Sequence, residues 1–249
     1  MKRSESGFTE DGILGNRVRL RQPVAGERAA IDPVVLAAAV PARPGETVLD
    51  VGAGSGVAAL CLAARLPDVV VDALEIQPDL VDLARENVEL NGFAARMTVY
   101  DGDILEAEAR LPRLPFDHLM TNPPFLEPGE GTESPEQGRR RAHVHAEADL
   151  ARWIGACLGL VRHGGTLTLV HRADRIDAIL AALHGQAGGV IVFPLWPHAG
   201  KPARRVIIQA RKGLAAPAVL HPGLALHDPA GGYSDDAEQV LRHAAAIRL

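Results

Sequence analysis

Short apolar runs alternate with amphipathic patterns through the middle of the chain. The apolar runs predict strands over 47–51, 69–75, 96–100, 116–121, 166–171, 190–195 and 204–210. The patterns between them predict helices over 55–65, 78–90, 147–162 and 173–184, and Gly164-Gly165 is the predicted stop of the third helix. Because parallel strands need crossover connections, this alternation predicts an α/β fold. We expect a doubly wound, seven-stranded, mostly parallel sheet with helices on both faces.

Three segments fall outside this alternation. Residues 1–45 form an expected N-terminal cap with a hairpin and a helix over 33–40. Residues 214–249 form an expected C-terminal extension with a helix over 234–242. Ser234 is placed to cap this helix. With the core at 46–213, we expect one domain over residues 1–249. The long polar loop at 126–146, which contains Arg139, Arg140 and Arg141, is expected to be either functional or disordered.

Charge and cysteine content narrow the functional classes. The chain has 26 basic and 31 acidic residues and a net charge of −5, which disfavours a dedicated duplex-DNA binder. Any nucleic-acid contact would need local basic patches such as alternating Arg17, Arg19 and Arg21, for which solvated surface is the alternative. The two cysteines have no CxxC spacing, and no apolar leader or membrane span is evident. A cytoplasmic protein with no membrane partner is expected.

A glycine-rich turn follows the first predicted core strand. Asp50 precedes Gly52, Ala53, Gly54 and Gly56, and a helix follows them. The third glycine comes one residue too early for the dinucleotide fingerprint. An acid just before the turn repels phosphate and suits a cationic ligand. S-adenosylmethionine (SAM) carries an ammonium and a sulfonium and no phosphate, so the turn predicts a SAM site.

Acidic residues also end the next two predicted strands. Glu75 lies about 20 residues past the turn, where a carboxylate can accept from both ribose hydroxyls. Asp103 follows the third strand and can accept from an adenine amino group. We assign Ile76 and Ile104, their neighbours, to the same pocket, and Asn122 as well. A generic turn with solvated acids is the alternative.

The sequence Asn122-Pro123-Pro124-Phe125 directly follows the fourth predicted strand. The Asn122 side-chain oxygen and the Pro123 carbonyl can accept both hydrogens of one planar NH₂ group. That contact localises the nitrogen lone pair for attack on a methyl group, and Phe125 can stack on the target ring. We therefore predict these four residues as catalytic. A plain turn with Phe125 in the core is the alternative.

Two further features have weaker functional interpretations. His143 and His145 are spaced like metal ligands but have no further ligands nearby, so no metal site is predicted. Trp196 lies near Gly200, Lys201 and Pro202, which indicates either a substrate-facing loop or a packed tryptophan.

Residues 48–56 resemble motif I of the Rossmann-like class I SAM methyltransferases, and residues 122–125 resemble the signature of their amino-methyltransferase branch. Residues 20–32 and 226–236 resemble the ends of the tRNA adenine-N6 methyltransferase family, which acts on the anticodon loop of a valine tRNA. The resemblance covers nearly the whole chain. It implies SAM as cofactor, at Asp50, Gly52, Gly54, Glu75 and Asp103, and a tRNA substrate at residues 122–125.

Other functions share these motifs. Glutamine-N5 methylation of a protein and guanine-N2 methylation of rRNA use the same polarisation of a planar NH₂ group. A non-catalytic SAM- or RNA-binding module is a third alternative, which the intact Asn122 and Phe125 oppose. Adenine-N6 methylation of tRNA is the function that the sequence favours.

Overall fold

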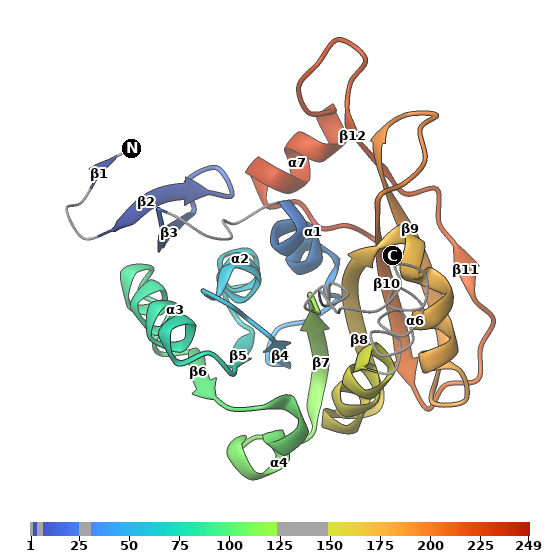
Figure 1. Cartoon of the computed structure of the whole chain (residues 1–249), viewed down its shortest axis with the longest axis horizontal. Helices are drawn as coiled ribbons and strands as arrows, with labels where there is room; N and C mark the ends of the chain where they lie inside the picture. Colours follow the sequence, from blue (N-terminus) through green and yellow to red (C-terminus); the bar gives the residue numbers. More distant parts are fainter. Residues whose placement is uncertain (1, 4–6, 25–30, 124–148) are drawn as a thin grey trace, which may run out of the picture.

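The computed structural model describes residues 2–3, 7–24, 31–123 and 149–249 (Figure 1). Their core is a single large sheet whose strands are β4 (Thr47–Val51), β5 (Val70–Glu75), β6 (Met97–Asp101), β7 (Phe116–Thr121), β8 (Val161–Arg172), β9 (Ala187–His198), β10 (Arg205–Lys212), β11 (Val219–Leu220) and β12 (Leu224–His227). The order is β11-β9-β10-β8-β7-β4-β5-β6, and β12 also pairs with β9. Pairs among β4 to β8 are parallel, whereas β10 runs antiparallel to both β8 and β9. The predicted doubly wound α/β fold is confirmed.

Helices connect and cover the strands. They are α1 (Ile31–Ala39), α2 (Val57–Arg65), α3 (Pro78–Leu90), the short η1 (Ile104–Glu106) and α4 (Ala107–Arg110), η2 (Ala173–Arg175), α6 (Ile176–Leu183) and α7 (Asp235–His243). Residues 149–160 are also helical. Within the described residues no helix is long and apolar enough to cross a membrane.

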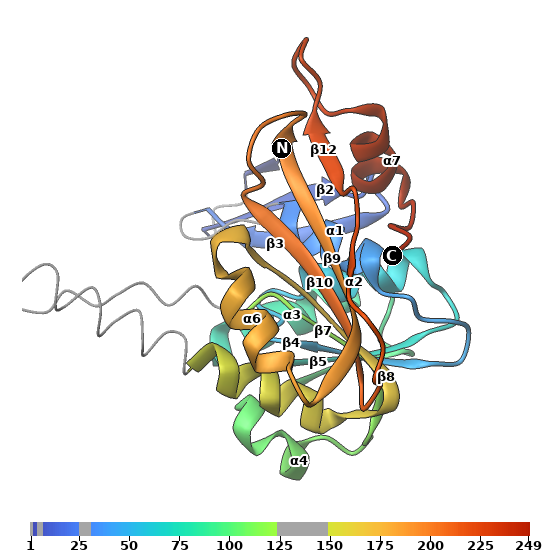
Figure 2. The ribbon, with the colours of Figure 1, turned by 90° about the vertical axis from the view of Figure 1, so that its right-hand side faces the viewer.

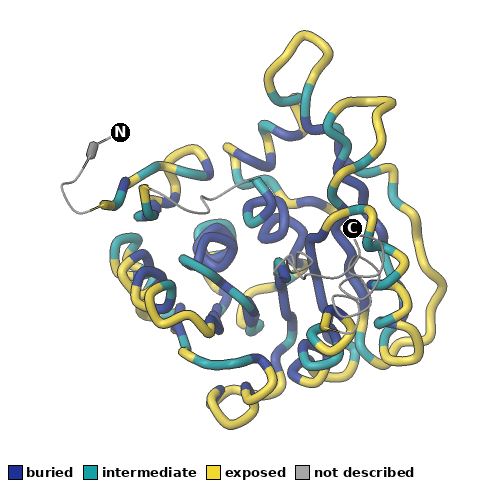
Figure 3. The backbone as a smooth tube through the Cα atoms, viewed as in Figure 1, coloured by how far each residue is buried: buried dark blue, intermediate teal, exposed yellow. Residues whose placement is uncertain are grey.

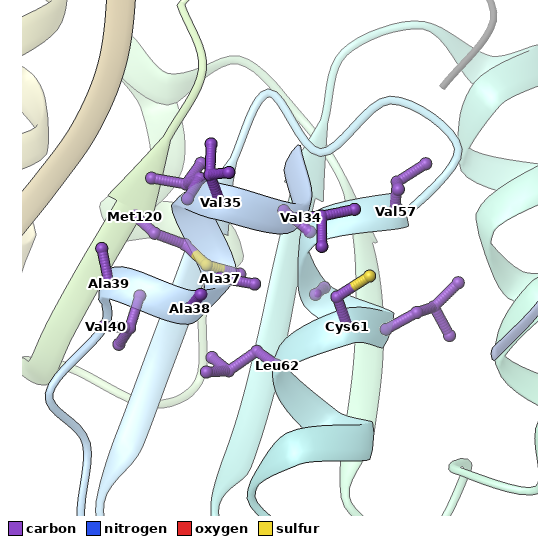
Figure 4. Packing of buried hydrophobic residues seen from close by; sticks show 14 of the residues in the cluster. Val34, Val35, Ala37, Ala38, Ala39, Val40, Val57, Cys61, Leu62 and Met120 are labelled. Atoms are coloured by element: carbon purple, nitrogen blue, oxygen red, sulfur yellow. The ribbon is translucent and has the colours of Figure 1, made fainter. Parts of the chain in front are cut away.

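Two buried clusters lie on opposite faces of the sheet. One joins α1, α2, α3 and α7 to residues such as Val48 and Val170, and the other joins α4, residues 150–160 and α6 to residues such as Leu49 and Leu169. Adjacent strand residues belong to different clusters because side chains alternate across a strand. Figure 4 shows the first cluster between α1, α2 and Met120 of β7, where alanines let the helices approach closely. Figure 3 shows the buried strands inside a more exposed shell.

The N-terminal hairpin docks through asparagine side chains. Strands β1 (Lys2–Arg3), β2 (Phe8–Ile13) and β3 (Val18–Pro23) form an antiparallel sheet. The amide of Asn87 accepts from the backbone N–H of Arg21 (2.7 Å) and donates to its carbonyl (3.0 Å), and Asn91 bonds Arg19 in the same way (2.8 and 2.7 Å). Asn87 lies in α3 and Asn91 caps its end, one helical turn farther along, and the two amides take the place of a neighbouring strand along β3.

The C-terminal extension closes the other end of the sheet. Ser234 caps α7 by accepting from the backbone N–H of Ala237 (3.2 Å), as predicted, and α7 packs on α1 and β12. Figure 2 shows β12 and α7 beside the long strands β9 and β10. Strand β12 pairs with the C-terminal part of β9, and β11 pairs with its middle.

The predicted number of strands and the predicted helix end near Gly164 need correction. The described sheet has nine strands rather than seven, because the short β11 and β12 add to the edge at β9. The helix predicted to reach Arg162 ends at residue 160, and β8 begins at Val161. Gly164 and Gly165 are strand residues and not a helix stop. A side chain at Gly165 would lie 2.4 Å from the backbone oxygen of Asp117, so the glycine allows close pairing with β7.

Candidate active site at the carboxyl edge of the sheet

Four parallel strands end side by side at one edge of the sheet. Val51 of β4 pairs with Leu74 of β5 on one side and with Thr121 of β7 on the other, and β6 lies beyond β5. The chain runs outward from β4 through β5 and β6 and then returns to the other side of β4 as β7. The strand order therefore reverses between β4 and β7, and ligands bind outside such a switch point.

The glycine-rich turn closes over this switch point. Gly52, Gly54 and Gly56 have φ values of +69°, +58° and +86°, which L-residues rarely adopt. The backbone N–H groups of Gly52 and Ala53 donate to the Leu74 carbonyl at 2.9 and 3.1 Å. A side chain added at Gly54 would meet no atom within 4 Å. The turn therefore presents its backbone to open space. Helix α2 begins after Gly56, at Val57, and not at Ser55 as the sequence predicted.

Two acids predicted for the cofactor lie under and beside the turn. The Glu75 carboxylate accepts from the backbone N–H groups of Gly54 (2.8 Å), Ile76 (3.0 Å) and Gln77 (2.9 Å). Asp50 is only 2% exposed and accepts from the N–H of Ala59 at 3.1 Å. Burial, and to a smaller extent the charge of Glu75, raise the pKa of Asp50 to about 7. A nearby cation would favour the ionised form of this carboxyl group.

The other predicted cofactor residues lie along the same edge. Ile76 follows Glu75 and is 57% exposed, so its aliphatic side chain is accessible to a ligand at this edge. Asp103 accepts from the N–H of Leu105 at 2.9 Å, and Ile104 is buried beside it. The Gly102 N–H donates to the Glu75 carbonyl at 3.0 Å, which joins the end of β6 to that of β5. The structure thus brings an exposed apolar surface and two carboxylates together next to the glycine turn.

Asn122 follows β7 directly across the switch point from this turn. Its side-chain oxygen is buried and has no hydrogen-bond partner among the described residues. A buried acceptor without a donor costs about 1–3 kcal/mol, so it is poised for an incoming N–H group. Pro123 is buried beside it. Pro124 and Phe125, also predicted as catalytic, lie outside the described residues.

Trp153 is a site residue that the sequence interpretation missed. Its indole N–H donates to the Thr121 hydroxyl at 3.1 Å, and that hydroxyl donates to the Val51 carbonyl at 2.8 Å. A side chain at Gly52 would lie 3.3 Å from the Trp153 ring. Trp153 therefore braces the ends of β4 and β7 between the glycine turn and Asn122. The one available signal was its rarity, since the chain has two tryptophans.

The arginine row of β3 is engaged within the protein. Arg19 pairs with Glu10 at 2.6 Å, Arg21 pairs with Glu86 at 2.9 Å, and Arg17 donates to the Arg242 carbonyl at 2.8 Å. These contacts favour the solvated-surface interpretation of the row. Residues 139–141, 143 and 145 lie outside the described residues. Among the described residues, no group of three or more His, Cys, Asp or Glu side chains is placed to hold a metal ion.

Comparisons with known proteins match this geometry. A model of the methyltransferase small domain matches residues 29–137. A tRNA1(Val) (adenine(37)-N6)-methyltransferase of Aeromonas hydrophila is 30% identical over 214 residues, which cover 84% of this chain and 86% of the relative. The chain belongs to this methyltransferase family. A Vibrio campbellii member of the family is 26% identical over 220 residues, 88% of each chain.

Solved structures agree with this membership. An Agrobacterium tumefaciens protein described as a predicted O-methyltransferase has a TM-score of 0.73 and 26% identity, over 87% of this chain and 98% of its own. TYW2 of Pyrococcus horikoshii, solved with MeSAdo, shares the fold with a TM-score of 0.55 at 16% identity, over 84% and 72% of the two chains. This family member is a SAM-dependent methyltransferase. Its open glycine turn, buried acids and exposed Ile76 fit a cationic, partly apolar cofactor.

Proposed function

We propose that this methyltransferase transfers a methyl group to the exocyclic N6 of an adenine in tRNA, with Asn122 as the central catalytic residue. The observation that carries the proposal is the buried Asn122 oxygen, which has no donor among the described residues and lies across the switch point from the glycine turn. The names of the curated relatives support tRNA as substrate. We also propose a cytoplasmic location, which a tRNA substrate supports, and a single methyltransferase domain over residues 1–249.

In this mechanism the protein orients and polarises the target nitrogen. The Asn122 oxygen accepts one hydrogen of the NH₂ group, and the Pro123 carbonyl accepts the other, so both hydrogens are held out of the ring plane. The nitrogen lone pair is then less delocalised and points towards the glycine turn. No side chain has to remove a proton first, because nitrogen loses its proton after it has bonded to carbon. Phe125 is proposed to stack on the target base.

The cofactor is assigned to the turn and its acids. Gly52, Ala53, Gly54 and Gly56 would approach it through the backbone, and Glu75 has lone-pair capacity left for a ribose hydroxyl beyond its three backbone contacts. Ile76 would pack on the adenine ring, and Asp103 would accept from its amino group. Bound SAM would supply a methyl group on a positively charged sulfur. The negative charge of ionised Asp50, beneath the turn, would attract that positive charge.

The test compares Asn122→Ala with Asn122→Asp. Alanine removes the acceptor, so turnover should fall by about 10²–10³, whereas SAM affinity should stay nearly unchanged. Aspartate keeps an acceptor oxygen at the same place and should retain clearly more activity than alanine. Unmodified tRNA and labelled SAM are the substrates, and mass spectrometry of nucleosides identifies the product. A folded Asn122→Ala protein that methylates at the parent rate contradicts the mechanism.

The product also separates the rival functions. N6-methyladenine in tRNA supports the proposal. Label in a protein glutamine, or in guanine of rRNA, would assign one of the alternatives that share the same polarisation. SAM binding without transfer to any of these would indicate a non-catalytic binding module.

A further inference from the structure

A pocket of about 610 Å³ lies apart from the glycine turn, where the β9–β10 hairpin meets the start of β12. Its lining residues include Trp196, Gly200, Lys201 and Gly223. Apolar prolines complete the wall. An aromatic ring and a cation in one open hollow form a combination that suits a planar, negatively charged ligand.

The indole nitrogen, the only polar atom of the Trp196 side chain, holds this side chain in place. Its indole N–H donates to the Pro222 carbonyl at 2.9 Å. Gly223 permits this approach, because a side chain there would lie 2.8 Å from the indole nitrogen and 2.2 Å from the Pro194 carbonyl oxygen. Gly223 also has a φ of +84°. With the N–H satisfied by backbone, Trp196 has only apolar ring surface left to offer to a ligand.

Further rings continue from Trp196 along the same face. Strand β12 pairs with β9 so that Ala225 lies opposite Trp196 and His227 lies opposite His198. The His198 and His227 ring centroids are 5.4 Å apart, and Tyr233 stacks on His227 at 5.2 Å. Residues two apart on a strand share one face, so Trp196, His198, His227 and Tyr233 form an aromatic row. The row holds one of the two tryptophans and one of the two tyrosines of the whole chain.

The charges at the pocket favour an anion. Lys201 and Arg204 are exposed on the β9–β10 hairpin, and neither forms an ion pair within the described part of the chain. The arginines of β3 differ in this respect, since Arg19 and Arg21 are paired with glutamates. Asp228, exposed at the far end of the aromatic row, is the acid that directly follows β12. The chain has a net charge of −5, so the unpaired Lys201 and Arg204 give this region a local positive charge that the chain as a whole does not have.

The pocket opens at the same edge of the sheet as Asn122. Strand β9 is antiparallel to β10, which is antiparallel to β8, so β9 ends at the edge where β7 ends. Three strand spacings separate β9 from β7, roughly 15 Å, and Trp196 extends about 10 Å farther along its strand than Asn122. The pocket is too far away for the reacting base, and this separation suits a nucleotide a few positions along the same RNA strand.

We propose that this pocket binds an unpaired nucleotide of the RNA substrate a few positions away from the methylated one, with the base stacked on Trp196 and a phosphate paired with Lys201. The RNA ligand rests on the proposed function, whereas the pocket itself is independent of Asn122. Base stacking tolerates any base, so the subsite would add affinity and register without adding sequence preference. It would hold a single-stranded loop across the carboxyl edge while the target base reaches Asn122.

Binding of unmodified tRNA to the full chain tests the subsite without any methyl transfer. Trp196→Leu should weaken RNA binding by about tenfold and raise the KM for tRNA, with kcat and SAM affinity nearly unchanged. Lys201→Ala should lower the slope of log K against log salt by about one unit. Arg211→Ala is the matched control, because it removes one exposed positive charge at the opposite end of β10 and should leave the slope unchanged. Quenching of tryptophan fluorescence by a single-stranded oligonucleotide should be larger in the parent than in Trp196→Phe, where Trp153 is the remaining tryptophan, and this difference would report direct stacking on Trp196.

The outcomes separate the subsite from the proposed function. If the wild-type protein binds tRNA and both pocket variants bind it equally well, the subsite is wrong and the function stands. If Arg211→Ala loses as much affinity as Lys201→Ala, the contact is diffuse and the proposal also fails. If the wild-type protein binds no RNA, both proposals fail. If Trp196→Leu does not fold, Lys201→Ala and the Trp196→Phe quenching experiment still decide.

Discussion

Gly54 and Gly45 permit a matched test of where the cofactor binds. Both have positive φ values, +58° and +83°, and a side chain added at either would meet no atom within 4 Å. Gly54 lies in the turn at the carboxyl edge, whereas Gly45 precedes β4 at the opposite edge. Changing each to alanine therefore adds the same methyl group, with the same kind of backbone strain, at two ends of one strand.

The magnitudes follow from these environments. An L-residue in the left-handed region costs roughly 1–2 kcal/mol, and nothing in the free protein clashes with either methyl group. For a chain of this size that cost lowers Tm by about 2–8 °C in both variants. In Gly54→Ala the methyl group also enters the open space beside Glu75. If SAM occupies that space, its affinity should fall at least about tenfold, or ~1.4 kcal/mol, in this variant alone.

Thermal unfolding and titration calorimetry with SAM measure the two quantities separately. The expected result is two similarly destabilised proteins, of which only Gly45→Ala binds SAM like the parent. The Gly54 N–H contact to Glu75 survives the substitution, since alanine keeps its backbone donor. Equal SAM affinity in the two variants would refute the placement of the cofactor at the glycine turn.

Two further predictions concern the buried polar groups around the turn. The pKa of Asp50 is raised from 3.8 to about 7, so the folded protein favours the protonated carboxyl group. The stability that this group contributes is fully present below pH 3.8 and is lost as pH rises through 7. A bound cation favours the ionised form, so SAM affinity should rise between about pH 6 and 8 in the parent and stay flat in Asp50→Asn; a parallel rise in both would contradict this. Asn87→Ala should cost about 2–4 kcal/mol in chemical unfolding, because this fully buried amide bonds Arg21 twice and the Ser55 carbonyl once. A loss below 1 kcal/mol would show that the hairpin docks by other contacts.

Local signals were sufficient for much of the fold. The predicted bounds of β4, β7 and α3 agree with the structure residue for residue. Each is bounded by residues whose backbone preference is strong, such as the glycines after Val51, the proline that opens α3 and the Asn91-Gly92 pair that ends it. The residues proposed for the site could be selected for the same reason, since they lie at or just after strand ends and parallel strands end together.

Long-range contacts explain what could not be predicted. Gly164 and Gly165 suggested a helix end, yet Gly165 is needed where β8 approaches the Asp117 carbonyl, 48 residues earlier in the chain. Strands β11 and β12 lie in a proline-rich segment, and they are strands because β9 is long enough to pair with both. Trp153 looked like an ordinary helix residue, because its partner Thr121 is 32 positions away.

The N-terminal hairpin and the C-terminal extension lie on the two sides of the edge where Asn122 lies. On one side, Asn87 ties the N-terminal hairpin to the Ser55 carbonyl in the glycine turn at 3.1 Å. On the other, β12 pairs with β9 at Trp196, and the N–H of Ile247 donates to the Ala38 carbonyl of α1 at 2.8 Å. A Rossmann-like core alone positions a cofactor and one reacting group. Because these additions flank the edge where Asn122 lies, they extend its surface in both directions. A substrate larger than a single base is what such an extended surface suits.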